Sequence, residues 1–541
     1  MNDAATLVTP ASGTLVPCPN HDTLPRRLSD FGTFGEALDY AASGQRGMNF
    51  HDPRGNLARV YPFRELREDA LAMARRLIAH GIKPQDRVAL VAETGPEFAA
   101  LSHPAAERQG CEGLSFEDFA ARPVPECDLP AASPDDICYL QYSSGSTRFP
   151  HGVAVTHASL LNNLAGHGEG MKLIQSDRCI SWLPWYHDMG LVGCFLSLIA
   201  NQVSVDYLKT EDFARRPLAW LDLISRNPGT SASYSPTFGY DICARRISSQ
   251  SNVSERFDLS RWRIAGNGAD MIRPDVMQGF VNAFAPAGFK ASAFLPSYGL
   301  AEATLAVTLM PPGEGIRVEL VEEERLSGTP RDLSRPARYR AIVNCGKAVK
   351  DMALEIRGAR GEVLPDHHIG KVWCRGPSVM VGYFRDPEAT EACLVPSEDG
   401  KGAWLDTGDM GYMVDGYLFI VGRAKDMIII NGKNHWPQDI EWAVEQLPGF
   451  NHGDIAAFSV ETDSGEESVA VLVHCRVSDP EERQKLHDTI RDKVRSILGH
   501  PAIVELVPPR TLPRTSSGKL SRAKAKKQYL SGEIEPIPLA A

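Results

Sequence analysis

The sequence predicts an α/β protein with a large N-terminal domain of parallel-rich sheets that includes a small β subdomain, and a small α+β C-terminal domain. Three observations support this class. The chain of 541 residues is too long for one hydrophobic core. Apolar strand-like runs alternate with helix-like segments in its first half, which is typical of a parallel sheet. Short glycine-punctuated strands follow, and a compact α+β tail ends the chain.

The alternation is clearest between residues 136 and 304. The segments "DICYLQY" (136–142) and "GVAVTH" (152–157) are predicted strands on either side of a polar loop, and "ASLLNNLAGHGEGM" (158–171) has helical spacing. Three later segments each run from an apolar strand into a polar loop, with a helix-like stretch behind it: "RCISWLPWYH", "WRIAGNGAD" and "AFLPSYGLAEAT". In a parallel sheet such loops gather at the carboxyl ends of the strands.

The sequence pattern changes near residue 342, from alternating strands and helices to short strands. Short strands such as "DMALEIRG", "GKVWCRG" and "GYLFIVG" predict a β subdomain over 342–423. We place the main boundary at the charged joint "GRAKD", which gives an N-terminal domain of 1–423 and a C-terminal domain of 424–541. The predicted tail contains the strands "DIAAFSV", "SVAVLVHCRV" and "AIVELV", and the amphipathic helix "PEERQKLHDTIRDKVRSILG".

Composition and charge limit which partners the protein can bind and where in the cell it is expected. A net charge of −11, with no dominant basic stripe, argues against nucleic-acid binding. The 11 cysteines include no C-x-x-C pair, which favours reduced thiols and a cytoplasmic location. The N-terminus does not read as a signal peptide, and the longest apolar run is too short to span a bilayer. We therefore expect neither a nucleic-acid partner nor integral membrane association.

The loop in "QYSSGSTRFPHGVAVTH" (141–157) has two possible interpretations, a surface linker or a phosphate-binding loop. It lies tightly between two predicted strands, and hydroxyl residues surround its glycine at Ser143, Ser144, Gly145, Ser146 and Thr147. Glycine allows successive backbone N–H groups to converge on an anion, and hydroxyls add donors. The loop is not a Walker A motif, because no G-K-[ST] closes it. We therefore favour phosphate binding over the linker.

Further motifs follow this loop in order. They are "WYHDMG" (185–190), "NGAD" (267–270), "SYGLAEAT" (297–304), "WLDTGD" (404–409), "GRAKDMIIINGKNHWPQDIE" (422–441) and "PRTSSGKLSR" (513–522). With this series the chain resembles the adenylate-forming superfamily of acyl-CoA synthetases, adenylation domains and luciferases. "GSTR", "YHDMGL" and "YGLAEAT" make it most similar to the fatty acyl-AMP ligases. The resemblance covers nearly the whole chain.

The resemblance implies that a carboxylate attacks the α-phosphate of ATP and forms an acyl-adenylate and pyrophosphate. Two anions must then meet, so donors and positive charge have to offset their repulsion. The residues implied in ATP and AMP binding are Ser143, Ser144, Gly145, Ser146, Thr147, Gly268, Ala269, Asp270, Ser297, Tyr298, Gly299, Asp409 and Arg423. Among them, Tyr298 would stack on adenine, and Asp409 with Arg423 would contact the ribose hydroxyls.

The resemblance also implies a metal ion and a catalytic lysine. Thr147 and Glu302 would hold Mg²⁺, which prefers oxygen ligands. Lys519, in "SSGKL", would contact the α-phosphate and the substrate carboxylate, with Thr147 and His187 as further catalytic residues. Lys425 matches the hinge about which the C-terminal domain swings. In isolation an exposed lysine, a solvated glutamate and a buried structural histidine are the commoner roles of Lys519, Glu302 and His187.

A fatty or related carboxylic acid is the implied substrate. The residues that would line its binding site are His187, Phe238, Gly239, Leu300 and Ala301. The long polar stretch at 311–341 stands where fatty acyl-AMP ligases carry an insertion, so we expect the phosphopantetheine thiol of an acyl carrier protein as acceptor. The basic residues Lys519, Arg522, Lys524, Lys526 and Lys527 could dock such a carrier, although a solvated helix face is their commoner role. Coenzyme A is the alternative acceptor.

Two departures from the family pattern leave a third possibility open. His151 stands where the family usually has a lysine, and a block of the first subdomain looks absent after about residue 101. A degenerate fold that binds nucleotide or acyl chains without turnover, acting as a scaffold, would fit these losses. The presence of Glu302, Asp409, Arg423 and Lys519 argues against that alternative.

Overall fold

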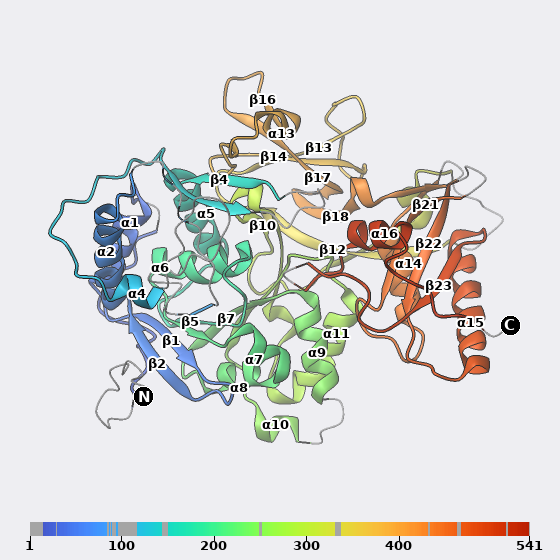
Figure 1. Cartoon of the computed structure of the whole chain (residues 1–541), viewed down its shortest axis with the longest axis horizontal. Coiled ribbons are helices and arrows are strands. Elements are labelled where there is room, and N and C mark those ends of the chain that lie inside the picture. The colour runs from blue at the N-terminus through green and yellow to red at the C-terminus, as the bar shows by residue number, and fades with distance from the viewer. Residues whose placement is uncertain are drawn as a thin grey trace.

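The structure, a computed structural model, describes residues 15–28, 30–83, 86, 88, 94–95, 116–142, 150–247, 252–330, 337–430, 433–462, 467–515 and 518–539. The elements of residues 433–539, which we call the C-terminal lobe, lie together at one side of the molecule (right in Figure 1). The α1 and α2 helices and the β1–β2 hairpin lie at the opposite side. This arrangement confirms the predicted α/β class with its large sheet-rich N-terminal part.

One large mixed sheet organises the N-terminal part. Its strand order among the described residues is β13-β14-β17-β18-β12-β10-β9-β8-β7-β5-β6-β1-β2. The run from β9 to β1 is parallel throughout. Its strands are β1 (Gly47–His51), β5 (Asp177–Ser181), β6 (Val205–Tyr207), β7 (Thr230–Ser235), β8 (Trp262–Asn267) and β9 (Phe294–Gly299), and the antiparallel β2 (Leu57–Pro62) adds an edge. The predicted parallel sheet is therefore present.

The rest of this sheet is antiparallel and contains the strands expected over 342–423. Its members are β10 (Ala306–Leu309), β11 (Val318–Glu322), β12 (Tyr339–Ala348), β13 (Ala353–Arg357), β14 (Gly370–Arg375), β16 (Leu394–Pro396), β17 (Ala403–Val414) and β18 (Tyr417–Arg423). Within the segment expected to be an insertion, β11 pairs with β12 from Val318 to Glu322, and α12 (Glu323–Ser327) follows. This part of 311–341 is thus an ordered arm of the sheet.

The helices cover the sheet, and some of them begin at a side-chain cap. In the N-terminal part they are α1 (Phe34–Ala42), α2 (Phe63–Ala79), α4 (Phe116–Ala120), α5 (His157–Gly170), α6 (Ser197–Ala200), α7 (Thr210–Arg215), α8 (Leu218–Arg226), α9 (Thr237–Ile247), α10 (Val253–Arg256), α11 (Pro274–Phe284) and α13 (Pro387–Cys393), with a π-helical segment η1 (Met189–Leu196). Thr156 Oγ1 accepts from the N–H of Ser159 and caps α5, which agrees with the helix predicted there. After β9 the chain forms only the short 3₁₀ turn η4 (Ala301–Ala303), where the sequence indicated a longer helix-like segment.

The strands β3 (Ile137–Tyr142) and β4 (Gly152–Thr156) form an antiparallel pair, with Tyr142 opposite Gly152, and β15 (Gly382–Tyr383) adds a third strand. The pair frames the serine-rich loop as predicted. The loop itself, at 143–149, lies outside the described residues, as do most of 84–115.

The C-terminal lobe has its own sheet and its own buried clusters. The strands β21 (Ile455–Glu461), β22 (Glu467–His474) and β23 (Ile503–Val507) form the sheet, and α14 (Pro437–Glu445), α15 (Pro480–Leu498) and α16 (Arg522–Leu530) pack around it. The short turn η5 (Ala424–Asp426) and the hairpin β19 (Ile428–Ile430)–β20 (Lys433–His435) connect it to β18. Asp479 caps α15 and Gly499, at φ 78°, ends it. None of the helices in the described part of the chain has the length and apolar character that crossing a bilayer requires.

Candidate active site

A cavity of about 1260 Å³ lies where the strand ends of the large sheet face the C-terminal lobe. The predicted site residues that line it are His187, Phe238, Ala269, Asp270, Ser297, Tyr298, Gly299, Leu300, Ala301, Glu302, Asp409, Arg423, Lys425 and Lys519. They come from the loops after β5 and β8, from α9, from β9 and the turn after it, from β17 and β18, from η5 and from the C-terminal lobe. The structure therefore brings together residues more than 300 positions apart in the sequence.

Asp409 is fixed from two sides at one end of this cavity. The β17–β18 register places Asp409 directly opposite Arg423, and Arg423 Nε lies 3.3 Å from Asp409 Oδ1. The hydroxyl of Tyr298, on β9, donates to Asp409 Oδ2 at 2.7 Å. Burial raises the pKa of Asp409, and the charge of Arg423 opposes that rise. A carboxylate held this way is suited to accept hydrogen bonds from two neighbouring hydroxyls of a ligand.

The loop that follows β8 forms a second side of the cavity. Ala269 has a φ of 71°, a left-handed conformation uncommon for residues other than glycine. Asp270 Oδ1 accepts from the backbone N–H of Thr237 at 3.2 Å. Burial raises the pKa of Asp270, whereas the positive charges of Lys519 and His452 lower it. Gly268 lies beneath this loop and does not line the cavity; a Cβ there would come within 2.7 Å of Ser297 Oγ.

Lys519 enters the cavity from the C-terminal lobe. Its loop is closed by the N–H of Thr515 donating to the carbonyl of Lys519 at 2.7 Å, and by Gly518 at φ 85°. The Lys519 ammonium donates to the carbonyl oxygen of Ala269 across the cavity. Burial lowers the pKa of Lys519, and the carboxylates of Asp270 and Asp188 oppose that shift. An anion that enters here would meet a cation already partly desolvated, which strengthens the attraction.

His187 and Asp188 stand together at the start of η1. His187 Nδ1 lies 2.7 Å from Asp188 Oδ1, and the N–H of Met189 donates to the same carboxylate oxygen at 2.7 Å. Burial acts to raise the pKa of Asp188, but His187 and Lys519 outweigh it, and the pKa lies below its usual range. The neighbouring Trp185 is buried and stacks on Phe195 at 4.4 Å, which anchors the turn that carries His187.

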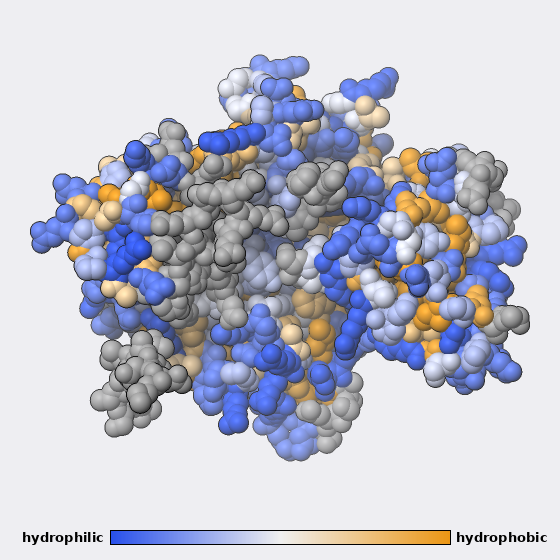
Figure 2. Space-filling view, in the orientation of Figure 1, coloured by the Kyte–Doolittle hydropathy of each residue, from blue (hydrophilic) through white to orange (hydrophobic). Residues whose placement is uncertain are grey.

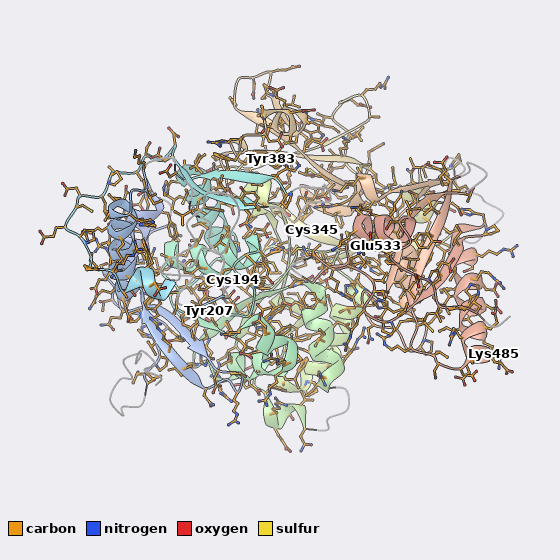
Figure 3. The ribbon with its side chains drawn as sticks, viewed as in Figure 1. Cys194, Tyr207, Cys345, Tyr383, Lys485 and Glu533 are labelled. Carbon is orange, nitrogen blue, oxygen red and sulfur yellow. The ribbon has the colours of Figure 1, made fainter. Side chains whose placement is uncertain are left out.

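Glu302 lies in η4 with one carboxylate oxygen engaged. The hydroxyl of Tyr383 donates to Glu302 Oε1 at 2.9 Å. Tyr383, labelled in Figure 3, comes from β15 beside β4, and the His151 ring lies tilted against its ring, with the centroids 4.9 Å apart. His151 Nδ1 lies 2.9 Å from Asp386 Oδ2. The histidine at the unusual position is therefore already paired with a carboxylate.

The part of the cavity behind Leu300 and Ala301 is largely apolar. Met189, Gly193, Leu305 and Leu309 line it, and His167 is its main polar group. His167 Nδ1 bonds Ser197 Oγ at 3.0 Å, and burial lowers the pKa of His167 to about 4, so the imidazole is neutral at pH 7. Phe238 lines the cavity near Trp182, with ring centroids 5.7 Å apart. Gly239 is packed away from the cavity, and a Cβ there would meet Ser235 Oγ at 2.1 Å.

Two groups of predicted residues remain untested by this geometry. Ser143, Ser144, Gly145, Ser146 and Thr147 lie outside the described residues. Lys425 lies in η5, between β18 and the C-terminal lobe, and it stays a predicted hinge residue. Its side chain lines the cavity, and burial together with Arg423 lowers its pKa.

Several residues of the site were not identified from the sequence. Asp188 stands inside the motif "WYHDMG" and could have been chosen with His187 as a charged neighbour. Tyr383, Glu445 and His452 also line the cavity, but no motif marks them. Their roles arise only from contacts with residues distant in sequence, such as the bond between Tyr383 and Glu302, which are 81 positions apart.

Comparisons with known proteins agree with this geometry. The model of the family "AMP-binding enzyme" matches residues 102–384. A putative acyl-CoA synthetase of Caulobacter vibrioides is 44% identical over 94% of this chain and 96% of its own length. A medium-chain-fatty-acid–[acyl-carrier-protein] ligase, JamA, of Moorena producens is 34% identical over 75% of this chain and 70% of its own. A solved structure from work on fatty acyl-adenylate ligases of E. coli and L. pneumophila is 40% identical, with a TM-score of 0.85, and the match covers 94% of this chain and 100% of that one.

Proposed function

Because the chain belongs to the AMP-binding enzyme family, within the adenylate-forming superfamily of ligases, we propose that it activates a fatty or related carboxylic acid with ATP and then passes the acyl group to the phosphopantetheine thiol of an acyl carrier protein. In the first step a carboxylate oxygen bonds to the α-phosphorus of ATP, and the bond to the leaving pyrophosphate breaks. In the second step the thiol sulfur bonds to the acyl carbon, AMP leaves, and the thiol proton passes to solvent.

One observation carries the proposal: the Lys519 ammonium lies inside the cavity that also holds Asp409, Tyr298 and Arg423. The Asp409 carboxylate would accept the ribose hydroxyls, with the Tyr298 ring against adenine and the loop at Gly268, Ala269 and Asp270 beside it. Ser297 and Gly299 would complete this nucleotide side. Lys519 would then stand between the α-phosphate and the carboxylate of the acid, where it offsets the repulsion between them.

The acid would lie along the apolar arm of the cavity. His187 lines the same cavity and is held by Asp188, whose carboxylate interacts electrostatically with Lys519. Phe238, Leu300 and Ala301 line the route that the chain of the acid would take, while Gly239 supports it from behind. An apolar arm of this kind excludes water from the reacting carbon and favours a hydrocarbon chain.

The donor chemistry on one side of the cavity fits Mg²⁺. Glu302 offers a carboxylate whose Oε1 accepts from Tyr383, and a hydroxyl from Thr147 would complete a set of hard oxygen ligands. In the described part of the chain no group of three or more His, Cys, Asp or Glu could hold a metal ion. When bound, the ion would neutralise charge on the phosphates. The serine-rich loop from Ser143 to Thr147 would add backbone donors for pyrophosphate.

Two observations bear on the acceptor. The arm formed by β11 and α12, within the expected insertion, packs Val321 and Leu326 into one buried cluster with Trp436, which starts α14. Such packing beside the predicted hinge at Lys425 favours the ligase that uses a carrier protein. The relative named as a putative acyl-CoA synthetase makes coenzyme A the second candidate acceptor.

The test combines a pool of acids with two acceptors. Purified protein is given ATP, Mg²⁺ and saturated fatty acids of several lengths, and pyrophosphate release and adenylate mass are measured. Holo carrier protein and coenzyme A are then compared at equal concentration, with apo carrier as the matched control. We expect adenylate from at least one acid and faster transfer to the holo carrier. Rapid acyl-CoA formation would contradict the carrier as acceptor, and bound ATP without pyrophosphate release from any acid would favour the scaffold.

A further inference from the structure

The loop that follows β8 meets the C-terminal lobe at two points. The first is Ala269, whose carbonyl accepts from Lys519. The second is Arg273, which precedes α11 and lies 2.5 Å from Glu445 of α14, from Nη1 to Oε2. Both side chains of this ion pair are nearly buried, with exposed fractions of 8% and 5%. Ala269 and Arg273, four positions apart on one loop, therefore contact two parts of the lobe, the lysine loop and α14.

Arg273 is held from both sides of the boundary. Its guanidinium binds Asp275 of α11 through Nη2 to Oδ2 at 2.8 Å. From the lobe side, α14 supplies Glu445 and also Trp442, whose ring centroid lies 5.4 Å from the Arg273 guanidinium. A guanidinium already bound by Asp275 loses less freedom when Glu445 binds it. Arg273 is thus the anchor to which Glu445 binds.

From Glu445 a continuous chain of hydrogen bonds leads to the lysine loop. Glu445 Oε1 accepts from the N–H of Gly453 at 2.7 Å. The carbonyl of Gly453 accepts from Arg514 Nη2 at 3.1 Å, and Arg514 Nη1 donates to the carbonyl of Gly518 at 3.0 Å. Gly518 directly precedes Lys519. Gly453 has a φ of 77°, and a Cβ there would lie 2.8 Å from Arg514 Nη2, so this link requires glycine.

We infer that Arg273 and Glu445 are positioning residues for adenylation, which set the place of Lys519 through Gly453 and Arg514. This inference rests on the proposed function, because it assigns Lys519 to the first step. The pair holds the lobe in the orientation that puts the ammonium in the cavity. It is needed when pyrophosphate is released and not when the thiol attacks, because only the first step uses Lys519.

A variant at Arg273 should slow adenylate formation and leave the transfer of the acyl group to the thiol nearly unchanged. Removal of the Arg273 charge leaves the nearly buried Glu445 with only His452 of the same lobe, 3.6 Å away, as its charged neighbour, so the closed orientation becomes less populated. For Arg273→Gln we expect adenylate formation, measured as pyrophosphate release, to fall about 10- to 100-fold, mostly in kcat, since hydrogen bonds to charged groups have this worth. Transfer from supplied acyl-adenylate to a pantetheine thiol should stay within about 3-fold of the parent, because Lys519 takes no part in it.

A double-mutant cycle tests whether the two residues act together. Glu445→Gln should resemble Arg273→Gln, and the double variant should be no slower than the slower single one, because an ion pair is lost only once. Arg256→Gln is the matched control: it removes a partly exposed pair with Asp222, 2.9 Å apart, which does not face the C-terminal lobe. Its rates should match those of the parent. Additive losses in the cycle, or equal losses in both half-reactions, would overturn the positioning role.

Hydrogen exchange gives a readout that needs no activity. In Arg273→Gln we expect faster amide exchange in residues 451–454 and 513–520 than in the parent and in Arg256→Gln, because the chain of bonds loses its anchor. Unchanged exchange in both segments would overturn the inference. If the parent forms no adenylate from any acid, the proposed function fails, and this exchange measurement still decides whether Arg273 positions the lysine loop.

Discussion

The two sides of the cavity are held in place by different interactions. The side that belongs to the large sheet rests on one continuous buried cluster, which includes Trp182, Trp220, Trp262 and Phe280. The side that belongs to the C-terminal lobe has separate clusters of its own, around Val471 and around Phe458. One further cluster crosses the boundary, through Trp436 near the predicted hinge.

Several polar contacts also join the C-terminal lobe to the rest of the chain. Arg273 pairs with Glu445, Arg340 Nε lies 3.0 Å from Asp439 Oδ1, and Arg245 Nη1 donates to Asn451 at 2.6 Å. On the face shown in Figure 2, hydrophilic residues follow the edge at which the lobe meets the sheet-rich part. Polar contacts can exchange with water when two bodies separate, whereas a shared apolar core cannot open at small cost. The comparison therefore leads us to expect that the lobe side separates more easily than the sheet side, with the cluster around Trp436 as the apolar contact that has to open.

The largest effect should come from truncating the sheet side. Trp220 is fully buried, its ring lies 5.2 Å from that of Trp262, and its Nε1 donates to Ser233 Oγ at 2.8 Å. Trp220→Ala should lower the free energy of unfolding by about 3–5 kcal/mol, as large-to-small core changes do. The control is Trp442→Ala, at the boundary under Arg273 and Arg340, which should cost about 1–2 kcal/mol because it removes two cation–π contacts. Denaturant unfolding measures both, and equal losses would contradict the comparison.

Next in size is the loss of the Lys519 ammonium. Lys519→Ala should slow adenylate formation by about 100- to 1000-fold, the range for removing one preorganised charge-stabilising donor. The unfolding midpoint should change little, because the side chain reaches across the boundary to the carbonyl of Ala269 and belongs to no buried apolar cluster. Lys485, an exposed lysine that lies on α15 at the outer edge of the lobe in Figure 3, supplies the control Lys485→Ala, for which we expect parental rates. Adenylate formed by Lys519→Ala at the parental rate would remove the catalytic assignment.

A smaller effect is expected on the sheet side at Asp409. Asp409→Asn should raise the KM for ATP by roughly 10- to 100-fold, because hydrogen bonds to a charged acceptor are lost. Asp406→Asn is the matched control. Asp406 lies on the same strand and pairs with Lys371 at 2.8 Å, but it does not line the cavity. Steady-state kinetics with varied ATP measure both variants. If both raised the KM equally, Asp409 would have no special part in nucleotide binding.

The sequence predicted local elements well on both sides of the cavity. The strand "GVAVTH" of the N-terminal part, and the strand "SVAVLVHCRV" and the helix at 480–498 of the lobe, are local patterns, and each was found where periodicity placed it. The pairing of Asp409 with Arg423 also follows from a neighbouring antiparallel strand pair. The exception near the cavity is the stretch after β9, where Thr304 adopts a φ of 66° and the expected helix-like segment is a short turn.

Contacts across the boundary could not be predicted from the sequence. Arg273 and Glu445 are 172 positions apart, and neither stands in a motif. Their partnership depends on how α14 lies against the loop after β8, which no local periodicity describes. The resemblance named Lys519 because its motif is short and ordered, yet it could not name Gly453 and Arg514, which connect the lysine loop to the anchor.

The smallest expected effect is a pH dependence at the boundary, carried by His452. Its Nδ1 lies 3.6 Å from Glu445 Oε2. Burial acts to lower the pKa of His452, but Glu445 and Asp270 outweigh burial and the opposing charge of Arg273, and the pKa lies above its ordinary value. A raised folded-state pKa means that protonated His452 stabilises the closed lobe below about pH 6.5, and that this stabilisation is lost as the pH rises through the raised pKa.

We therefore expect amide exchange in residues 451–454, corrected for intrinsic exchange rates, to become faster between pH 6 and pH 8. The increase should be only about 2- to 5-fold, because the imidazole is partly exposed to water. His452→Gln should show the pH 8 behaviour at both values, and a variant that kept the parental pH dependence would assign the titration to another group.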